Sequence, residues 1–458
     1  MTLGTPERPL RVAIIGAGPS GFYAAEALFK SEKALTVDMF EKLPVPFGLV
    51  RSGVAPDHPK IKNVTKVYEK IASNPAFQFF GNVTIGKDIS VDELKQFYDA
   101  LIFTSGAASD RRLGIPGEDL AGSHTATEFV AWYNGHPEYR DRHFDLSQET
   151  AVIIGQGNVA IDVCRILSKS VDELKQTDIA KHALDALAES KIKDIYMIGR
   201  RGPAQAAFTP QEAKELGELE IADAMVSSRD MQLGAICEAE LLLADKGHNR
   251  KNMEILKGLA EKGATGKARR LHVEFFYSPV ELRGEGRLQE VVLERNALSG
   301  EAGKQKASGT GEKRILPCGL LFRSVGYKGT AMPGVPFHES WGVFPNEKGK
   351  IETGLYVAGW IKRGPSGVIG TNKPCSYETV EALLADLDQL PGCEQPFTQA
   401  LLDLLKSRQT RVVSFDDWRQ IDAAEVARGQ EVGKPREKFT RVADMLAVLE
   451  GTPAAVSV

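Results

Sequence analysis

The sequence predicts an α/β protein with two Rossmann-like, three-layer nucleotide-binding domains. Two glycine-rich fingerprints carry this prediction, GAGPSG at residues 16–21 and GQGNVA at residues 155–160. Each follows a short apolar run that is typical of a buried strand, residues 11–15 and 151–154, and each opens a segment with helical spacing. One such match is also typical of a tight strand–helix turn without a ligand, whereas two matches in this context indicate two dinucleotide sites.

The residues after the two fingerprints differ in charge. Glycines let the backbone approach a pyrophosphate, whose charge is met by the N–H groups of the helix start. After the first fingerprint, the strand 35–40 ends in Glu41, and a carboxylate at this place accepts hydrogen bonds from ribose hydroxyls. After the second, the strand 194–198 leads to Arg200 and Arg201, whose guanidinium groups match a 2′-phosphate, although such a pair can also be merely solvated. We therefore expect FAD at the first site and NADPH at the second.

Composition limits the class of protein. The chain has 458 residues, 42% of them hydrophobic, and a net charge of −4, so two or three globular domains are expected. This charge gives no general reason to expect binding to nucleic acid or to an anionic membrane. No apolar stretch is long enough for a transmembrane segment. The short polar run before the first strand resembles no targeting peptide, so we expect a cytoplasmic protein.

The cysteines are scattered and form no CxxC or other close pair. An iron–sulfur cluster, a metal site and a redox disulfide therefore have no recognisable ligands, and we expect no metal. Flavoproteins of the thioredoxin-reductase or glutathione-reductase type pass electrons through a close cysteine pair, which this chain lacks. Electrons are thus expected to leave the flavin directly. The five cysteines are Cys164, Cys237, Cys318, Cys375 and Cys393.

The second fingerprint lies within the segment 107–330, which we expect to form the NADP-binding domain. A strand at 99–106 and a turn-rich stretch at 114–118 mark where the chain crosses into it. The remaining expected features of this domain are a helical insert after Val171, a strand pair formed by 271–277 and 288–295, a surface loop at 300–311, and a strand at 316–326 that leads back.

A third glycine-rich element follows the strand 355–360. It spans residues 364–370 and precedes a helical run at about 376–390. In flavoproteins of glutathione-reductase-like layout, such an element closes over the flavin, with its N–H groups facing the edge where negative charge builds on reduction. We therefore expect a discontinuous FAD-binding domain, residues 1–106 and 331–458, although the glycine-rich run could also be only a helix-capping loop.

The chain resembles the adrenodoxin reductase family of ferredoxin–NADP reductases, in particular its bacterial members, over nearly its whole length. The run 46–59 is the most specific part of this resemblance. The supporting motifs are GAGPSG at 16–21, PFGLVRSGVAPDHP at 46–59, GQGNVA at 155–160, GRRGP at 199–203, LPCG at 316–319, SVGY at 324–327 and GWIKRGPSG at 359–367. Phe47 stands where some bacterial members have tryptophan, which leaves any role of an indole N–H open.

The resemblance implies a set of contacts for each cofactor. The FAD contacts are expected at Gly16, Gly18, Pro19, Gly21, Glu41, Leu49, Val83, Trp360, Gly367, Val368 and Ile369. The NADPH contacts are expected at Arg111, Gln156, Gly157, Asn158, Val159, Arg200, Arg201, Glu212 and Gly367.

The family places a histidine–glutamate pair beside the nicotinamide, and His58 and Glu215 are at the matching positions. Hydride transfer needs no general base, so the pair is expected to orient the ring and tune the local charge. His58 could also be a simple turn residue. Residues 209–212 have the pattern of a capping box, so Glu212 could serve its own helix, and Glu215 lies one turn further on the same face.

The function implied is transfer of a hydride from NADPH to FAD, and then of single electrons to a ferredoxin that supplies a cytochrome P450 or another ferredoxin-dependent system. Ferredoxins are acidic, so a basic docking surface is expected. The candidates are His248, Asn249, Arg250, Lys251, Lys257, Lys262, Lys267, Arg269 and Arg270. Two alternatives stay open: a monooxygenase that uses FAD and NADPH, and a non-enzymatic scaffold.

Overall fold

The computed structural model describes residues 2–451, and within them the chain divides into two units. Unit 1 contains residues 2–54, 58–110 and 326–451 of the described chain, and unit 2 contains residues 55–57 and 111–325. Unit 1 is therefore discontinuous, and unit 2 is inserted into it. The outer limits of the expected FAD domain, residue 1 and residues 452–458, lie outside the described residues.

Unit 1 is built on a six-stranded sheet with the order β16-β17-β4-β1-β2-β3. All neighbours are parallel except β16 and β17. β1 lies inside the sheet, and all of its residues are buried, which explains its unbroken apolar sequence. The strands are β1 (Leu10–Ile15), β2 (Leu35–Glu41), β3 (Phe77–Gly81), β4 (Ala100–Phe103), β16 (Lys350–Glu352) and β17 (Leu355–Val357).

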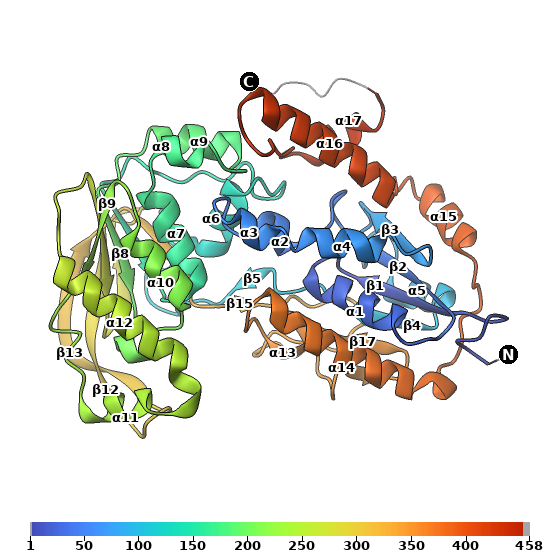
Figure 1. Cartoon of the computed structure of the whole chain (residues 1–458), viewed down its shortest axis with the longest axis horizontal. Helices are drawn as coiled ribbons and strands as arrows, with labels where there is room; N and C mark the ends of the chain where they lie inside the picture. The colour runs from blue at the N-terminus through green and yellow to red at the C-terminus, as the bar shows by residue number, and fades with distance from the viewer. Residues whose placement is uncertain (1, 452–458) are drawn as a thin grey trace. The chain divides into compact units, whose positions relative to one another are not determined.

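Helices cover both faces of this sheet. Val12 and Ile14 point into a core that α1, α4, α14, α16 and α17 complete, whereas Ala13 and Ile15 point into a second core with α5 and α15. α1 and α14 pack side by side (Figure 1). The helices are α1 (Pro19–Phe29), α2 (Leu49–Ser52), α3 (Pro59–Lys62), α4 (Thr65–Ala72), α5 (Val91–Phe97), α13 (Trp360–Arg363), α14 (Asn372–Ala385), α15 (Thr398–Ser407), α16 (Phe415–Glu431) and α17 (Val442–Val448), with short 3-10 turns η3 (Ile369–Thr371) and η4 (Leu387–Gln389).

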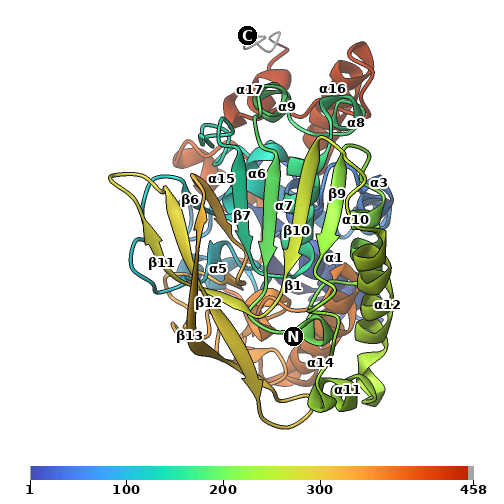
Figure 2. The same cartoon turned by 90° about the vertical axis from the view of Figure 1, so that its left-hand side faces the viewer.

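Unit 2 contains a second six-stranded sheet, which is parallel throughout and has the order β6-β14-β7-β8-β10-β9. A separate antiparallel sheet, β11-β12-β13, lies beside it (Figure 2). The strands are β6 (Ser123–Thr125), β7 (Thr150–Ile154), β8 (Asp194–Ile198), β9 (Ala222–Val226), β10 (Arg269–Glu274), β11 (Tyr277–Arg283), β12 (Glu290–Ser299), β13 (Lys306–Pro317) and β14 (Leu320–Arg323).

The parallel sheet of unit 2 is the middle of three layers. Ala151 and Ile153 face a core that α6, α7, α9, α10 and α12 complete, while Val152 and Ile154 face residues of β11 and β12. The Rossmann-like, three-layer α/β architecture expected from the sequence is confirmed. The helices are α6 (Ala126–Tyr133), α7 (Asn158–Ser168), α8 (Val171–Leu174), α9 (Lys181–Ala188), α10 (Pro210–Gly217), α11 (Ala235–Leu241) and α12 (Gly247–Lys262), with 3-10 turns η1 (Pro203–Gln205) and η2 (Ala244–Lys246).

Two expectations about unit 2 are wrong. Of residues 271–277, only Tyr277 pairs with the segment 288–295, because it begins β11 and lies opposite Arg295 of β12, whereas β10 joins β8 and β9 in the parallel sheet. The stretch 300–311 is not a loop throughout, since residues from Lys306 onward belong to β13. The side chains of this part of β13 are largely exposed, so the strand is held by its ladder with β12 and leaves no apolar pattern in the sequence.

The limits of unit 2 lie a few residues from those expected. β5 (Ser109–Asp110) pairs with β15 (Tyr327–Lys328) in an antiparallel ladder that belongs to unit 1. Unit 1 therefore extends to residue 110 and resumes at residue 326. Of the chain between them, all of residues 111–325 belong to unit 2, and residues 55–57 join it as well. Which unit binds which nucleotide stays a prediction at this point.

Candidate nucleotide-binding sites

The first fingerprint forms the turn between β1 and α1. Gly16 has a φ of +114°, and a Cβ atom there would lie 2.7 Å from the Thr104 carbonyl oxygen. At Gly21 a Cβ atom would overlap the Gly16 carbonyl oxygen. Gly18 caps α1 and has open space where a side chain would begin, and Pro19 is the first helical residue. The free N–H groups at the start of α1 therefore face open space beside Gly18. Such N–H groups fit a pyrophosphate.

Glu41 lies directly against this turn. Its carboxylate accepts hydrogen bonds from the backbone N–H of Ala17 (3.1 Å) and of Leu43 (3.3 Å). Burial raises the pKa of Glu41, and these two N–H groups offset part of that rise. Val83 is buried beside it and donates its N–H to the Glu41 carbonyl oxygen (3.0 Å). The remaining lone pairs of the carboxylate fit the ribose hydroxyls of a dinucleotide.

Residues 47–49 cross over the first fingerprint. Phe47 donates its N–H to the Ala17 carbonyl oxygen (2.8 Å) and has a φ of +83°, which is unusual for a bulky residue. Gly48 approaches so closely that a Cβ atom on it would lie 3.1 Å from the Cα of Gly18. The Phe47 ring is buried, so it contributes to the core rather than to an exposed aromatic surface. Leu49, by contrast, is 39% exposed at the start of α2.

The segment after β17 is held in an irregular conformation. Trp360 begins α13, and its indole N–H donates to the Ser366 carbonyl oxygen (3.2 Å). Gly367 has a φ of +81°, and Val368 is exposed. Val368 donates its N–H to the Thr371 hydroxyl (3.1 Å) just before α14 begins. Ile369, the last expected flavin contact, is the first residue of η3.

Arg363 brings positive charge to the start of α1. Its Nη2 donates to Asn372 Oδ1 (3.0 Å), which also accepts a hydrogen bond from the Ser20 hydroxyl (3.0 Å). The Nε and Nη1 atoms of Arg363 are buried and have no hydrogen-bond partner among the described residues. Buried unpaired guanidinium N–H groups are costly, so these two groups fit an anionic oxygen of a bound FAD.

The second fingerprint repeats the geometry of the first between β7 and α7. Gly155 has a φ of +129°, and a Cβ atom there would overlap the Ser324 carbonyl oxygen. Gly157 caps α7 and has open space where its side chain would begin. This turn also offers a helix start to a pyrophosphate.

Side-chain amides fix the turn around Gly157. Gln156 donates its Nε2 to the Glu274 carbonyl oxygen (2.9 Å), and Asn158 Oδ1 accepts the N–H of Thr209 (2.9 Å). Val159 is part-buried in the first turn of α7. Four of the expected NADPH contacts, residues 156–159, thus lie together in the fingerprint.

Arg200 and Arg201 follow the end of β8 and are exposed. Within residues 2–451 neither guanidinium group forms an ion pair. Their backbone is nevertheless fixed. Asn296 Nδ2 donates to the Arg200 carbonyl oxygen (2.8 Å), and the Phe276 N–H donates to the Arg201 carbonyl oxygen (3.0 Å). Two free guanidinium groups on a turn with a fixed backbone match the charge and geometry of a phosphate.

Further amides hold the residues after this pair. Gln205 Oε1 accepts the N–H of Gly202 (3.2 Å), and Gln205 Nε2 donates to the buried carboxylate of Glu240 (3.0 Å). Asn249, in the first turn of α12, donates to the carbonyl oxygens of Ala204 (2.9 Å) and Ala206 (3.1 Å). A cavity of about 310 Å³ lies beside this turn, and Arg201, Lys246 and His248 are among its lining residues.

The expected capping box at the start of α10 is only half formed. Glu212 donates its N–H to the Thr209 hydroxyl (3.4 Å). The Thr209 N–H, however, is taken by Asn158. The Glu212 side chain is therefore not needed as a cap, and it is buried within unit 2.

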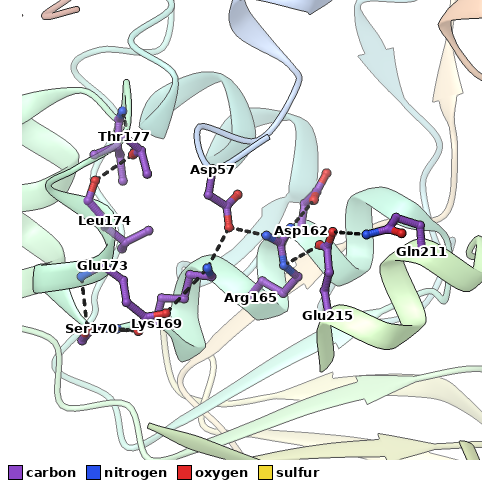
Figure 3. A network of polar contacts seen from close by, with 11 residues as sticks. Asp57, Asp162, Arg165, Lys169, Ser170, Glu173, Leu174, Thr177, Gln211 and Glu215 are labelled. Atoms are coloured by element: carbon purple, nitrogen blue, oxygen red, sulfur yellow. Dashed lines mark hydrogen bonds and ion pairs between the residues drawn. The ribbon is translucent and has the colours of Figure 1, made fainter. Parts of the chain in front are cut away.

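A buried network of charges holds Glu215 (Figure 3). Arg165 of α7 lies 3.0 Å from Glu215, donates to Asp162 (3.1 Å) and forms an ion pair with Asp57, which Lys169 also contacts at 3.0 Å. Burial lowers the pKa of Arg165, but the surrounding carboxylates overcome this and raise it. Arg165 therefore stays charged.

His58 and Arg111 are the remaining expected site residues. His58 precedes α3 and belongs to unit 1, whereas Glu215 belongs to unit 2, so their meeting stays a prediction. Arg111 begins the main segment of unit 2 and is exposed.

The expected basic patch is largely engaged in structural contacts. Arg250 donates to the carbonyl oxygens of Leu241 and Leu243 at the end of α11, and Arg270 pairs with Asp194 (2.6 Å). The guanidinium of Arg269 and the ammonium of Lys267 also bind backbone carbonyl groups. The basic side chains of the patch that stay exposed on α12 are Arg250, Lys251, Lys257 and Lys262, together with His248.

Known proteins resemble this chain over nearly its full length. A model of the pyridine nucleotide-disulphide oxidoreductase family matches residues 10–199. The NADPH-ferredoxin reductase FprA of Mycobacterium tuberculosis is 44% identical over 455 residues, which cover 96% of this chain and 99% of that protein. The human mitochondrial NADPH:adrenodoxin oxidoreductase is 43% identical over 460 residues, covering 97% and 93%. This chain belongs to the NADPH-ferredoxin reductase family.

A solved structure of this NADPH-ferredoxin reductase family has the same fold. The Mycobacterium tuberculosis FprA structure in complex with NADPH superposes with a TM-score of 0.92 at 44% identity, covering 96% of this chain and 99% of that one. The resemblance inferred from the motifs is thereby confirmed, and the chain is an oxidoreductase with FAD and NADP(H) as cofactors.

The cysteines distinguish this reductase family from flavoproteins that use a disulfide. Four of them are buried, Cys375 is part-buried, and all five are free. Burial raises the pKa of Cys318 to about 12, which opposes formation of a thiolate. Within the described residues no helix is long and apolar enough to cross a membrane.

Sequence reasoning missed several side chains that support these sites. Arg165 and Asp57 were not found, because neither belongs to a fingerprint and their partners are distant in sequence. Arg363 lies inside the quoted motif 359–367, where a charged residue in a glycine-rich segment was an available signal. The amide side chains Asn249 and Asn296 carried no signal, since only the fold brings them to backbone carbonyl groups.

Proposed function

We propose that the protein is an NADPH:ferredoxin oxidoreductase in which unit 1 binds FAD and unit 2 binds NADPH. The observation that carries this assignment is the contrast between the two glycine turns. A carboxylate, Glu41, lies against the first turn, whereas two unpaired arginines, Arg200 and Arg201, follow the strand beside the second. Bound FAD would take the hydride of NADPH and return its electrons one at a time to an iron–sulfur protein.

The residues of unit 1 bind and orient the flavin nucleotide in this proposal. Glu41 accepts hydrogen bonds from the ribose, and the start of α1 receives the pyrophosphate at Gly18. Arg363 supplies two N–H groups to an anionic oxygen. The segment from Trp360 to Ile369 lines the isoalloxazine ring and keeps water from it.

The residues of unit 2 select NADPH over NADH. The Arg200 and Arg201 side chains bind the 2′-phosphate, and the amide contacts hold the backbone of the turn and leave both guanidinium groups free to bind it. Charge-assisted hydrogen bonds of this kind contribute about 1.5–3 kcal/mol each, so loss of the phosphate is costly. Glu212 and Glu215 face the nicotinamide side, where Arg165 holds the Glu215 side chain by an ion pair.

We propose that the iron–sulfur partner docks on the exposed face of α12. Lys251, Lys257 and Lys262 are exposed on this helix, and the exposed Glu254 and Glu261 alternate with them along the chain. The surface is thus weakly basic, which favours fast encounter with an acidic partner rather than tight binding. Arg250 contacts backbone carbonyl groups of α11, so Lys251 is the better residue for a test of docking.

Anaerobic reduction by NADPH and by NADH tests the cofactor assignment. We expect rapid bleaching of the flavin by NADPH and at least tenfold slower reduction by NADH at equal concentration, which corresponds to about 1.4 kcal/mol. In Arg200→Ala/Arg201→Ala the two donors should become equivalent, while Arg283→Ala, which removes an exposed guanidinium from β11, should behave like the parent. NADH as the better donor of the parent protein would contradict the assignment.

Steady-state reduction of candidate ferredoxins tests the acceptor and its docking. Lys251→Glu should raise the apparent KM for ferredoxin several-fold at low salt and less at high salt, because salt screens exposed charges. Ferricyanide reduction should be unchanged. NADPH oxidation that is linked to oxygenation of an organic substrate, with no ferredoxin reduction, would instead indicate a monooxygenase. A cytoplasmic location stays a prediction, which cell fractionation would test.

A further inference from the structure

The segment 414–439, which no motif explains, lies against the turn that crosses the first fingerprint. We call this segment, which comprises α16 and the residues after it, the C-terminal clasp. Glu425 of the clasp accepts two hydrogen bonds from Arg51, one from Nη1 (2.8 Å) and one from Nη2 (2.5 Å). The Glu425 side chain is fully buried, and that of Arg51 is 10% exposed. The pair is therefore a bidentate ion pair held away from water.

Other contacts of the clasp close around the same pair. Glu425 also accepts the backbone N–H of Phe439 (2.9 Å) and a hydrogen bond from Arg436 (3.2 Å). Burial alone would raise the pKa of Glu425, but Arg51 and Arg436 overcome it and lower the pKa. Lys438 donates to the Arg51 carbonyl oxygen (3.3 Å). Both the side chain and the backbone of Arg51 are thus fixed by one segment.

The turn that precedes Arg51 is under strain. Phe47 has a φ of +83°, a conformation that costs a bulky residue about 1–3 kcal/mol unless its surroundings enforce it. Trp418 of the clasp contacts the Phe47 ring edge-on, with centroids 5.9 Å apart, and lies under the Arg51 guanidinium at 5.3 Å. The clasp therefore holds both ends of the turn from Phe47 to Arg51.

This turn defines one wall of the first nucleotide site. Phe47 donates its N–H to Ala17, and Gly48 passes close to Gly18, the glycine that leaves space for a ligand. A shift of the turn by less than 1 Å would change the width of that space. Buried ion pairs add little stability compared with apolar residues of equal volume, but a bidentate pair fixes orientation.

We propose that Glu425 is a positioning residue for the flavin. Through Arg51 it holds the 47–51 turn in place against Gly18, so that the first nucleotide site has its binding geometry before FAD binds. This inference rests on the proposed assignment of FAD to unit 1. It assigns the C-terminal clasp a role in cofactor affinity, in addition to its packing on the core.

Titration of the apoprotein with FAD, followed by flavin fluorescence, tests the proposal. Glu425→Gln should raise the Kd for FAD by about tenfold or more, since it leaves Arg51 buried without its anion. Arg51→Lys keeps the positive charge but loses the bidentate guanidinium contact, and it should raise the Kd for FAD by less. The visible circular dichroism of the bound flavin should change in both variants, and the Kd for NADP⁺ should not.

A double variant separates positioning from stability. Arg51→Met/Glu425→Gln removes both charges at similar volume and leaves an amide oxygen for the Phe439 N–H. Its Tm should stay close to that of the parent, because the unpaired buried charge is gone. Its Kd for FAD should still rise several-fold, because no bidentate contact orients the turn.

Asp99→Asn is the matched control. Asp99 is also a fully buried carboxylate of unit 1 with a bidentate arginine, Arg8, and it accepts the backbone N–H groups of Arg11 and Cys393. It lies at the opposite ends of the strands from the fingerprint, where β1 and β4 begin. Asp99→Asn should lower the Tm and leave the Kd for FAD within about twofold.

The outcomes separate two failures. Parent apoprotein that binds NADP⁺ but no FAD would contradict the proposed function. Parent protein that binds FAD, together with Glu425→Gln and double variants that bind it with the parent Kd and dichroism while folded, would overturn the role of Glu425 alone. A rise of the Kd in Asp99→Asn equal to that in Glu425→Gln would also overturn it, because loss of any buried ion pair would then suffice.

Discussion

Within each fingerprint, one glycine is needed for the turn and another for the ligand. At Gly16 and Gly155 the backbone has a positive φ and a Cβ atom would meet a carbonyl oxygen. Gly18 and Gly157 have φ values of −90° and −102°, which alanine also adopts, and nothing lies within 4 Å of a Cβ atom there. The second pair of glycines is therefore explained by space for a nucleotide rather than by the fold.

Gly157→Ala should consequently fold normally and bind NADP⁺ poorly. We expect a Tm within about 2 °C of the parent and a Kd for NADP⁺ raised about tenfold or more, because the methyl group occupies the place of the pyrophosphate. FAD content should be unchanged. Gly18→Ala is the reciprocal control and should lose FAD but not NADP⁺ affinity. Calorimetric titration and flavin absorbance measure both, and normal NADP⁺ binding by Gly157→Ala would contradict the assignment.

His182 makes the stability of unit 2 depend on pH. Burial lowers its pKa to about 4, below the ordinary value of 6.5. The unfolded chain therefore binds more protons than the folded protein between these values, and the free energy of unfolding falls as the pH falls through 6.5 toward 4. Between pH 7 and 5 this loss amounts to about 2 kcal/mol.

His182→Gln should remove that part of the pH dependence. Urea unfolding of the parent and of the variant at pH 7 and pH 5 measures it, and the difference between the two proteins is the readout, since many carboxylates also titrate at low pH. Equal pH dependence in both proteins would show that His182 is not buried in its neutral form.

Local signals explain which site residues could be predicted. The fingerprints, Glu41 and the Arg200–Arg201 pair are each fixed by a short spacing from a strand end, so sequence spacing sufficed. The supporting ion pairs could not be predicted from the sequence, because their partners are distant. Asp57 and Arg165 are 108 residues apart, and Arg51 and Glu425 are 374 residues apart. Partners at such separations are chosen by the fold and leave no local pattern.

At the scale of elements, strand existence was easier to predict than strand partners. β10 and the start of β12 have the composition of strands, but one joins a parallel sheet and the other an antiparallel one. Register and neighbour depend on contacts between distant segments. β13 was missed in part because its exposed residues need no apolar alternation when the ladder with β12 supplies their hydrogen bonds.

The first turn of α12 holds the backbone after Arg201, in the turn to which we assign the 2′-phosphate. Asn249 binds the carbonyl oxygens of Ala204 and Ala206, so Asn249→Ala removes both hydrogen bonds. It should loosen the turn after Arg201 and raise the KM for NADPH about three- to tenfold. The KM for NADH should not change. Asn134→Ala, which removes an amide contact to Val130 at the end of α6, is the control and should affect stability only. Equal loss with both donors would contradict this role.

At the scale of the whole molecule, the long segment of unit 2 begins and ends beside one strand pair of unit 1. Asp110 pairs with Tyr327 in the β5–β15 ladder, and residues 111–325 lie between them. A chain in which an Asn-Gly turn joins Asp110 to Gly326 therefore keeps every strand pair of the six-stranded sheet of unit 1.

This shortened chain should fold and bind FAD, but NADPH should not reduce it. Asp57→Asn belongs in the same chain, because Arg165 and Lys169 would be absent and the carboxylate would lose its partners. Flavin absorbance after purification and anaerobic mixing with NADPH measure the outcome. Reduction by NADPH at the parent rate would contradict the location of the second nucleotide site in unit 2.

The dependence of the first turn on the C-terminal clasp sets an order for events during synthesis. Residue 51 leaves the ribosome 374 residues before Glu425, an interval of about 20–75 s at about 5–20 residues per second. Unit 2 is almost continuous in sequence and can fold in that interval, whereas the sheet of unit 1 gains β17 and its clasp only near the end. If FAD binds in unit 1 as proposed, we therefore expect flavin loading to be a late event, which follows translation of nearly the whole chain.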